Sequence, residues 1–333
     1  MIKLAGDIGG THSRIALLIT QQSKQDILIE KTYLSTQYSS LTAVIEDFLL
    51  AHKISLPIDA VCFAVAGPVV FGALNTSTAK ITNLPWKISE QEISKSLNTN
   101  NVKLINDFSA AAYGVTTLAE DNFSIIYHGK RNIVDDNIQD AVIMGAGTGL
   151  GVAHIVSLTG NYHVYPSEAG HVGFAPVNIL QCELLIWLYK KHQHVSLEML
   201  LSGNGLMTIY QFMHDIKKIP ESSNVIKNMK LMDPAEVISE AGLLAEDELC
   251  RQSLDVFVDI YAAAASNVVL HYYPVKVLYI AGGIAPKIIK KLNSQPFINT
   301  YLNKGSMSYI IEKVTVKLVL EDKVGLIGAL SLV

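Results

Sequence analysis

The sequence predicts an α/β protein built from two related domains. Three observations favour this class: strand-like and helix-like segments alternate along the chain, a hairpin with a glycine-rich tip opens each half, and 50% of the 333 residues are hydrophobic. A chain of this length is long enough for two domains of ordinary size, and its apolar content can fill two cores.

The first half opens with LAGDIGGTHSRIALLI, in which apolar arms flank a Gly-Gly turn. We interpret this segment as a β-hairpin. Apolar residues at helical spacing predict a helix over Leu41–His52. A strand in AVCFAVAGPV follows, ended by Gly67-Pro68, and a buried strand in NVKLIND leads into a helix that begins near Phe108.

The second half opens with AVIMGAGTGLGVAHIV, a second predicted hairpin whose layout repeats the first. A glycine-punctuated loop, PSEAGHVGFAP, and helices up to about residue 200 come next. Residues 214–252 are the most polar part and are interpreted as a peripheral helical layer. In it, Asp233-Pro234 is typical of a helix start, and Gly242 is expected to end that helix.

The most apolar stretch, Val256 to Ile284, is interpreted as a buried helix followed by a buried strand. The chain then ends with a strand in KVTVKLVL and a helix in KVGLIGALSLV. We expect the closing segment to return to the first domain. The predicted division is therefore a small domain of residues 1–114 plus 312–333 and a large domain of residues 115–311.

Charge and cysteine content exclude several classes of protein. A net charge of −4 argues against a protein that coats nucleic acid. Cys62, Cys182 and Cys250 are far apart, so we expect buried free thiols rather than a disulfide framework or a structural zinc site. No signal peptide is recognised, and no apolar run reaches the ~18 residues of a membrane span, so we expect a soluble protein of the cytoplasm.

The tip of the first hairpin fits a phosphate. Its glycines allow close approach of backbone N–H groups to phosphate oxygens, and Thr11 adds a hydroxyl donor. Asp7 would repel phosphate, so its useful role is to hold Mg²⁺, directly or through water. The candidate nucleotide-binding residues here are Gly6, Asp7, Ile8, Gly9, Gly10 and Thr11. A tight turn with a solvated aspartate is the alternative interpretation.

Two further glycine-rich turns are candidates for the same nucleotide. The tip with Gly145, Gly147, Thr148 and Gly149 has no lysine of a Walker A loop, and a strand follows it where a dinucleotide fingerprint would have a helix. A second phosphate cradle fits better. Gly282-Gly283, between a strand and a helix, would let adenine or ribose press against the backbone. Each turn could instead serve only to reverse the chain.

Asn106 and Asp107 lie at the carboxyl end of a predicted strand, the edge that faces the ligand in α/β sheets. A carboxylate there suits a general base that acts on a hydroxyl group. A helix N-cap at Asp107 is the alternative.

Taken together, these segments resemble the superfamily of hexokinases, actin and heat-shock chaperone ATPases. Within it, the chain is similar to the bacterial glucokinases that lack zinc, over residues 4 to about 330. The resemblance is carried by segments in family order: GDIGGTHSRIAL, LINDFSAAAYG, GAGTGLGVAHI, EAGHVGFAP, HVSLEMLLSG and IAGGIAPK.

The resemblance implies two actin-like (RNase H-like) domains around a deep cleft, and the phosphorylation of glucose by ATP and Mg²⁺, the entry step of glycolysis. Asp107 would be the base on the sugar 6-hydroxyl. The sugar ligands would be Asn106, Asp107, Glu168, His171 and Glu198. We expect Glu168 and Glu198 to be buried partners of sugar hydroxyls. A homodimer is also implied, because relatives are often dimers.

The chain departs from related kinases in three places. A cysteine-rich zinc motif is replaced by a stretch with only Cys182, so no zinc is expected. Gly173 stands where relatives often carry an acidic residue, and the segment Val70–Trp86 is longer than in some relatives; Thr82 and Asn83 in it are candidates to line the sugar site. Alternatives are another hexose kinase of the same fold, for fructose, mannose or an N-acetylhexosamine, and a non-enzymatic actin-fold regulator.

Overall fold

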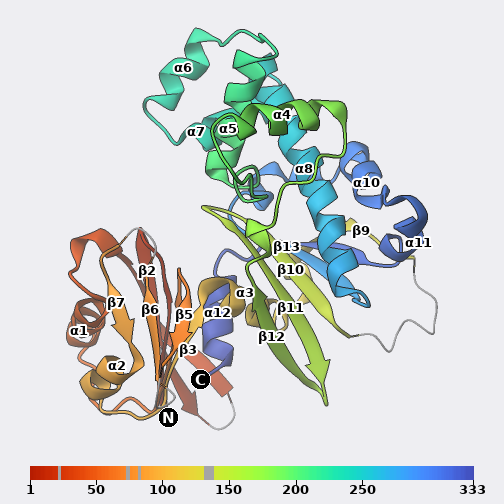
Figure 1. Cartoon of the computed structure of the whole chain (residues 1–333). Helices are drawn as coiled ribbons and strands as arrows, with labels where there is room; N and C mark the ends of the chain where they lie inside the picture. Colours follow the sequence, from red (N-terminus) through yellow and green to blue (C-terminus); the bar gives the residue numbers. More distant parts are fainter. Residues whose placement is uncertain (22–23, 73–75, 82–83, 131–138) are drawn as a thin grey trace. The chain divides into compact units, whose positions relative to one another are not determined.

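The computed structural model (Figure 1) describes residues 1–21, 24–72, 76–81, 84–130 and 139–333. The chain forms two compact units. Unit 1 contains Met1–Ala119, Tyr162–Val164 and Glu321–Val333, and unit 2 contains Glu120–Asn161 and Tyr165–Leu320.

A five-stranded sheet in the order β3-β2-β1-β4-β8 forms the centre of unit 1. Its strands are β1 (Ile2–Ile8), β2 (His12–Gln21), β3 (Lys24–Leu34), β4 (Ala60–Val65) and β8 (Val102–Asn106). The first three strands are antiparallel, and β4 and β8 run parallel to β1. The predicted hairpin is therefore confirmed as β1–β2.

Side-chain size differs between the two faces of this sheet, because neighbouring residues along a strand point to opposite faces. Leu4 and Ile8 of β1 belong to a core of large side chains that includes Phe48 of α1 (Leu41–Ala51) and Leu97 of α2 (Glu90–Leu97). On the other face, small residues such as Ala5 lie against the helices α3 (Asp107–Val115) and α12 (Val324–Ser331). Figure 1 shows the two pairs of helices on opposite sides of the sheet.

The two helices α3 and α12 approach each other at glycines. A Cβ atom on Gly328 would lie 1.7 Å from the carbonyl oxygen of Ala110, and one on Gly114 would lie 2.1 Å from that of Val324. Only glycine fits at these contacts, which place the end of the chain against the sheet of unit 1. A separate three-stranded sheet completes the described part of this unit, with strands β5 (Val69–Phe71), β6 (Ser77–Lys80) and β7 (Lys87–Ser89).

Unit 2 contains a six-stranded sheet in the order β12-β11-β10-β13-β14-β9. Its strands are β9 (Phe123–Tyr127), β10 (Ala141–Ala146), β11 (Leu150–Leu158), β12 (Asn161–Ser167), β13 (Val277–Ala281) and β14 (Thr315–Val319). As in unit 1, the opening hairpin, β10–β11, is antiparallel, and β13 and β14 run parallel to β10. Counted from the opening hairpin, the strand order β12-β11-β10-β13-β14 of unit 2 matches β3-β2-β1-β4-β8 of unit 1, and β9, which precedes the hairpin in the chain, is an additional edge strand. The predicted repeat of two related α/β halves is therefore confirmed.

The helices of unit 2 are α4 (Ile179–Tyr189), α5 (Gly203–Asp215), α6 (Ser223–Met229), α7 (Pro234–Leu243), α8 (Glu248–Tyr272), α9 (Ile289–Leu292), α10 (Gln295–Leu302) and α11 (Ser308–Ile311). Helix α8 is the centre of this group. The side chain of Asp247 caps its start by accepting the N–H of Cys250 at 2.8 Å, and it ends before Pro274, which disfavours helical backbone in the preceding residue.

Of the described residues, α8 is the one helix whose length and composition would suit a membrane span. However, 78% of its most apolar window is buried inside the protein. Such burial is typical of a core helix, which agrees with the predicted buried helix and strand between Val256 and Ile284.

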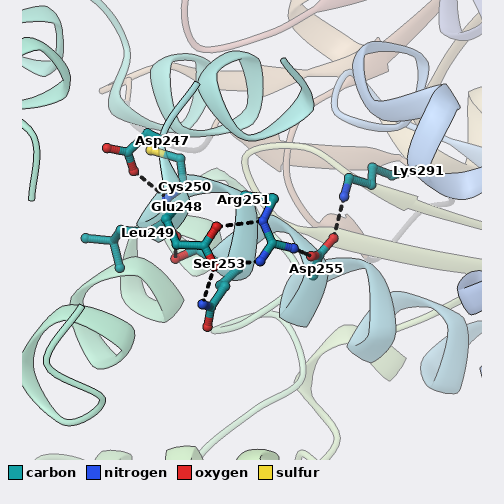
Figure 2. A network of polar contacts seen from close by, with 9 residues as sticks. Asp247, Glu248, Leu249, Cys250, Arg251, Ser253, Asp255 and Lys291 are labelled. Atoms are coloured by element: carbon teal, nitrogen blue, oxygen red, sulfur yellow. Dashed lines mark hydrogen bonds and ion pairs between the residues drawn. The ribbon is translucent and has the colours of Figure 1, made fainter. Parts of the chain in front are cut away.

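A network of polar side chains on α8 includes a contact to α9 (Figure 2). The Arg251 guanidinium donates to both carboxylate oxygens of Glu248, at 2.6 and 2.8 Å, and to Asp255 at 2.9 Å. These three residues share a helix face because they are three and four positions apart. Lys291 of α9 donates to the other oxygen of Asp255 at 2.5 Å, so α9 and α8 are linked through that carboxylate.

Several expectations about elements need correction. The strand expected to return to the first domain, β14, pairs with β13 and β9 in unit 2, and only the segment from Glu321 onwards belongs to unit 1. Strand β8 is an edge strand of its sheet and not a buried one. The domain boundaries as a whole stay a prediction.

Helix ends also differ from expectation. Gly242 lies inside α7, where its missing Cβ allows close contact with the backbone of Cys250, so it does not end the helix. No helix spans residues 190–202, because α4 ends at Tyr189 and α5 begins at Gly203. Cys62 and Cys250 are buried free thiols as expected, whereas Cys182 is exposed.

Candidate active site

The first hairpin places Asp7 just before its tip, where the N–H of Gly9 donates to the carbonyl of His12 at 2.9 Å. Gly6 has no room for a side chain, since a Cβ would lie 2.8 Å from the ring of Phe63 and 2.9 Å from the carbonyl oxygen of Arg14. Burial raises the pKa of Asp7, while the positive charge of Arg14 lowers it. The hairpin therefore holds a partly buried carboxylate beside a glycine turn, and a carboxylate is a ligand suited to Mg²⁺.

Asn106 and Asp107 lie at the junction of β8 and α3. Asn106 is the N-cap: its side-chain oxygen accepts the N–H groups of Phe108 at 3.0 Å and Ser109 at 3.1 Å. The alternative of Asp107 as N-cap is therefore wrong. The capping interactions are made by Asn106, which leaves Asp107 at the first helical position.

Asn106 also orients its neighbour. Its amide nitrogen donates to Oδ1 of Asp107 at 3.0 Å and to the carbonyl of Gly67 at 3.3 Å. The N–H of Phe108 donates to the same Oδ1 at 2.8 Å. Both bonds end on Oδ1, so Oδ2 is the oxygen left outside these contacts.

Burial is the main reason that the pKa of Asp107 is raised, to about 6, and the nearby charge of Asp7 adds to it. The hydrogen bonds from Phe108 and Asn106 act in the opposite direction. Asp7 and Asp107 are thus close enough in unit 1 to interact electrostatically. A carboxylate with a pKa near neutrality can accept a proton from a hydroxyl group and release it again.

In unit 2 the side chain of Glu198 is held by the second hairpin. The N–H of Leu150 donates to Oε2 of Glu198 at 2.8 Å, and a Cβ on Gly149 would lie 2.5 Å from that oxygen. The backbone N–H of Glu198 donates to the carbonyl of Gly170 at 2.9 Å. These contacts join the hairpin tip, residues 168–171 and Glu198 into one local structure.

His171 lies between the two glutamates predicted to bind sugar. Its Nε2 is 3.9 Å from Oε2 of Glu168, and its Nδ1 is 3.9 Å from Oε1 of Glu198. The side chain of Glu198 is 32% exposed, whereas that of Glu168 is 86% exposed. The expectation of burial is therefore wrong for Glu168 in this structure, although the three side chains do gather in one place.

The second hairpin tip and Gly282-Gly283 are also neighbours in unit 2. The N–H of Gly147 donates to the carbonyl of Gly149 at 2.8 Å, and β10 and β13 lie side by side. Gly282 has φ +85°, and a Cβ on it would lie 2.3 Å from the carbonyl oxygen of Ala146. Only glycine tolerates this close approach, which sets the candidate adenosine turn beside the candidate phosphate hairpin.

The structure thus brings together the candidates of each unit. In unit 1 these are the first hairpin, Asn106 and Asp107; in unit 2 they are the second hairpin, Gly282-Gly283 and the Glu168, His171 and Glu198 group. Thr82 and Asn83 lie outside the described residues. Within the described ranges, no group of three or more His, Cys, Asp or Glu side chains is arranged to hold a metal ion.

Sequence reasoning missed one feature of unit 1. A cavity of about 390 Å³ lies beside the first hairpin, lined by Asp7, Gly9, His12, Arg14, Thr32 and Asp322. Arg14 could have been found, because it directly faces Asp7 in any hairpin with this tip. Asp322 could not, since it lies more than three hundred positions further along the chain.

Comparisons with known proteins agree on one family. A family model described as Glucokinase matches residues 4–333. The glucokinase of Trichormus variabilis is 37% identical over 340 residues, covering 98% of this chain and 97% of that protein.

Among solved structures, a glucokinase from an Antarctic psychrotroph matches with a TM-score of 0.82 at 32% identity, covering 99% of this chain and 98% of that one. A glucokinase from Balamuthia mandrillaris, solved in complex with glucose, matches with a TM-score of 0.80 at 20% identity, covering 99% and 93%. These similarities confirm the actin-like two-domain fold, and the chain belongs to the glucokinase family.

Proposed function

We propose that this chain transfers the γ-phosphoryl group of ATP to the 6-hydroxyl of glucose, with Asp107 as the general base. The observation that carries the proposal is the state of that carboxylate: it is partly buried, its pKa is raised to about 6, and Asn106 and Phe108 fix it through Oδ1. A base held in this way keeps Oδ2 for the hydroxyl proton and is ionised at neutral pH.

Phosphoryl transfer is largely a matter of positioning and of charge stabilisation. The backbone N–H groups of the glycine hairpins would contact phosphate oxygens, and Gly282-Gly283 would contact adenosine. Asp7 would hold Mg²⁺, directly or through water, and the bound ion would neutralise part of the phosphate charge. Family membership implies ATP and a divalent metal, and the carboxylate of Asp7 fits that ion.

The sugar would be read by Glu198, Glu168 and His171, together with Asn106 and Asp107. Carboxylates accept hydrogen bonds from vicinal hydroxyls, and a histidine ring can donate or accept. Oε2 of Glu198 is fixed by the N–H of Leu150, so Oε1 is the oxygen available to a sugar. Exposure of Glu168 leaves its carboxylate free to turn toward a ligand.

Family membership favours glucose over the other hexoses and over a non-enzymatic regulator. We further propose that the enzyme acts in the cytoplasm, since its three cysteines are free thiols. A homodimer stays a prediction.

Replacement of the base tests the proposal. Asp107→Asn keeps the size of the side chain but cannot accept the proton, so we expect kcat to fall by a factor of ~10² to 10⁴. The dissociation constant for glucose, measured by calorimetry, should change by less than about tenfold. Asp121→Asn, at an exposed turn, is the matched control and should retain the wild-type kcat. A kcat near wild type in Asp107→Asn would remove Asp107 from the mechanism.

A further inference from the structure

A row of polar side chains crosses three strands of unit 1 beside the first hairpin. Asp7 on β1 is paired with Arg14 on β2, and Arg14 is paired with Thr32 on β3. Residues paired across neighbouring strands project from the same face of a sheet. All three line the cavity described above, which begins at Gly9 of the candidate phosphate tip.

Arg14 is the one permanently charged cation among the residues that line this described cavity. The other charged lining groups, Asp7 and Asp322, are carboxylates, and two unbalanced carboxylates would repel a polyphosphate. An arginine presents several N–H donors in a planar fork that matches phosphate oxygens. Among the side chains that line this cavity, Arg14 is therefore the one whose permanent charge would favour a polyphosphate.

Asp322, from the C-terminal segment, holds the Arg14 guanidinium at two points. Nη2 of Arg14 donates to Oδ2 of Asp322 at 3.1 Å, and Nη1 donates to its backbone carbonyl at 3.4 Å. The Arg14 side chain is 31% exposed and that of Asp322 is 69% exposed, so an isolated surface pair of this kind adds little to stability. Its main consequence is to fix the direction of the guanidinium.

The same C-terminal segment also abuts Asp7. A Cβ on Gly325 would lie 3.3 Å from Oδ2 of Asp7, so the start of α12 lies against that carboxylate. In the C-terminal segment, Asp322 thus contacts Arg14, and Gly325 lies against Asp7. This segment is therefore placed to set the orientation of both.

We propose that Arg14 contacts the polyphosphate of the bound nucleotide and that Asp322 is a positioning residue that aims Arg14 at it. The proposal rests on the proposed function, because it takes the first hairpin as a phosphate site. It assigns to the C-terminal segment an indirect role in nucleotide affinity, because Asp322 contacts Arg14 and not the nucleotide.

A double-mutant cycle tests the proposal, with Arg14→Gln, Asp322→Asn and the combination of both. Loss of a charge-assisted hydrogen bond should raise KM for ATP in Arg14→Gln by roughly 10- to 100-fold. Asp322→Asn should raise it by a smaller factor, about three- to tenfold, because only the direction of Arg14 is affected. The double variant should match Arg14→Gln alone, and KM for glucose should stay within about twofold in all three.

Lys31→Gln is the matched control, since Lys31 is the neighbour of Thr32 on β3 and pairs at 3.9 Å with Asp47, and neither residue lines the cavity. It should leave KM for ATP unchanged. The proposal is overturned if Asp322→Asn leaves KM for ATP unchanged or lowers it, if the two substitutions are additive, or if KM for glucose rises by the same factor.

Equilibrium binding separates this proposal from the proposed function. The dissociation constants of ADP and adenosine, measured by calorimetry, need no sugar and no turnover. ADP should bind more weakly to Arg14→Gln and to Asp322→Asn, whereas adenosine should bind all variants alike. If the wild-type chain failed to phosphorylate glucose but showed this pattern, the proposed function would fail and the role of Arg14 and Asp322 would stand.

Discussion

Asp107 shows how the surroundings of a single residue set its chemistry. Burial raises its pKa to about 6, Asp7 adds to the rise, and the N–H donors of Phe108 and Asn106 limit it. Without the donors the pKa of the carboxyl group would be higher, and without burial it would be lower and the carboxylate a weaker base. The balance leaves a carboxylate that is ionised near pH 7 and still takes up a proton readily.

The raised pKa has a measurable effect on stability. The unfolded-state pKa is about 3.8 and the folded-state pKa about 6, so the folded protein binds more protons between these values. The contribution of Asp107 to the free energy of unfolding is therefore most favourable below pH 4 and is lost as pH rises through 6.

Asp107→Asn removes this dependence. In urea titrations, the variant should match the wild type near pH 4 and exceed it by up to about 3 kcal/mol above pH 6, on the order of 1.4 kcal/mol per pKa unit. The same titration of Asp59→Asn, whose carboxylate accepts the N–H of Ile2 at 2.5 Å, controls for the loss of a single carboxylate elsewhere in unit 1. A stability difference that stayed constant from pH 4 to pH 7 would mean that the pKa of Asp107 is not raised.

At the scale of elements, the glycine turns have distinct structural requirements. Gly282 has φ +85°, and the space for its Cβ is filled by the backbone of Ala146, whereas a Cβ on Gly283 would meet nothing within 4 Å. Glycine is therefore required by the fold at Gly282, whereas at Gly283 only a bound ligand could require it.

We expect Gly282→Ala to destabilise the protein by at least ~2 kcal/mol, because alanine is strained at positive φ and its methyl group would press on a carbonyl. The free energy of unfolding of Gly283→Ala should lie within about 0.5 kcal/mol of the wild-type value. The same variant should bind ADP more weakly if adenosine lies against this turn. Chemical denaturation and calorimetry measure the two effects. Wild-type stability of Gly282→Ala would contradict the close approach between β13 and the second hairpin.

The elements that sequence reasoning found are those with a strong local signal. Apolar arms around glycines predicted both hairpins, and the spacing of apolar residues predicted α1 and α8. Strand β12 was missed because most of its residues are exposed and show no alternation. The partner of β14 could not be predicted either, since parallel pairing with β13 joins residues far apart in sequence.

The candidate site divides in the same way. Motifs located Asp7, Asp107 and the glycine tips, because the residues of each motif are consecutive. They gave no indication that Asn106 caps α3, or that Leu150 holds Glu198, since both depend on backbone N–H groups placed by the fold. The role of Asp322 could not be predicted either, because its partner Arg14 lies at the other end of the chain.

At the scale of the whole molecule, the residues proposed to take part in the reaction belong to two units whose hairpins open sheets of related strand order. Unit 1 supplies Asp7 and Asp107, and unit 2 supplies the second hairpin and the glutamates. Neither unit holds both Asp107 and the two glutamates proposed to bind the sugar. Water is also a competent nucleophile toward ATP, so an enzyme built in this way should react slowly until a sugar is bound.

Phosphorylation of a panel of sugars tests the central claim most directly. Purified protein is supplied with ATP, Mg²⁺ and either glucose, fructose, mannose, N-acetylglucosamine or no sugar; ADP release gives the rate, and phosphorus NMR identifies the product. We predict glucose 6-phosphate as product, a kcat/KM for glucose at least ~10-fold above that for the other hexoses, and sugar-free hydrolysis ~100-fold slower or less. Preference for another hexose, or ATP hydrolysis at the same rate without sugar, would contradict it.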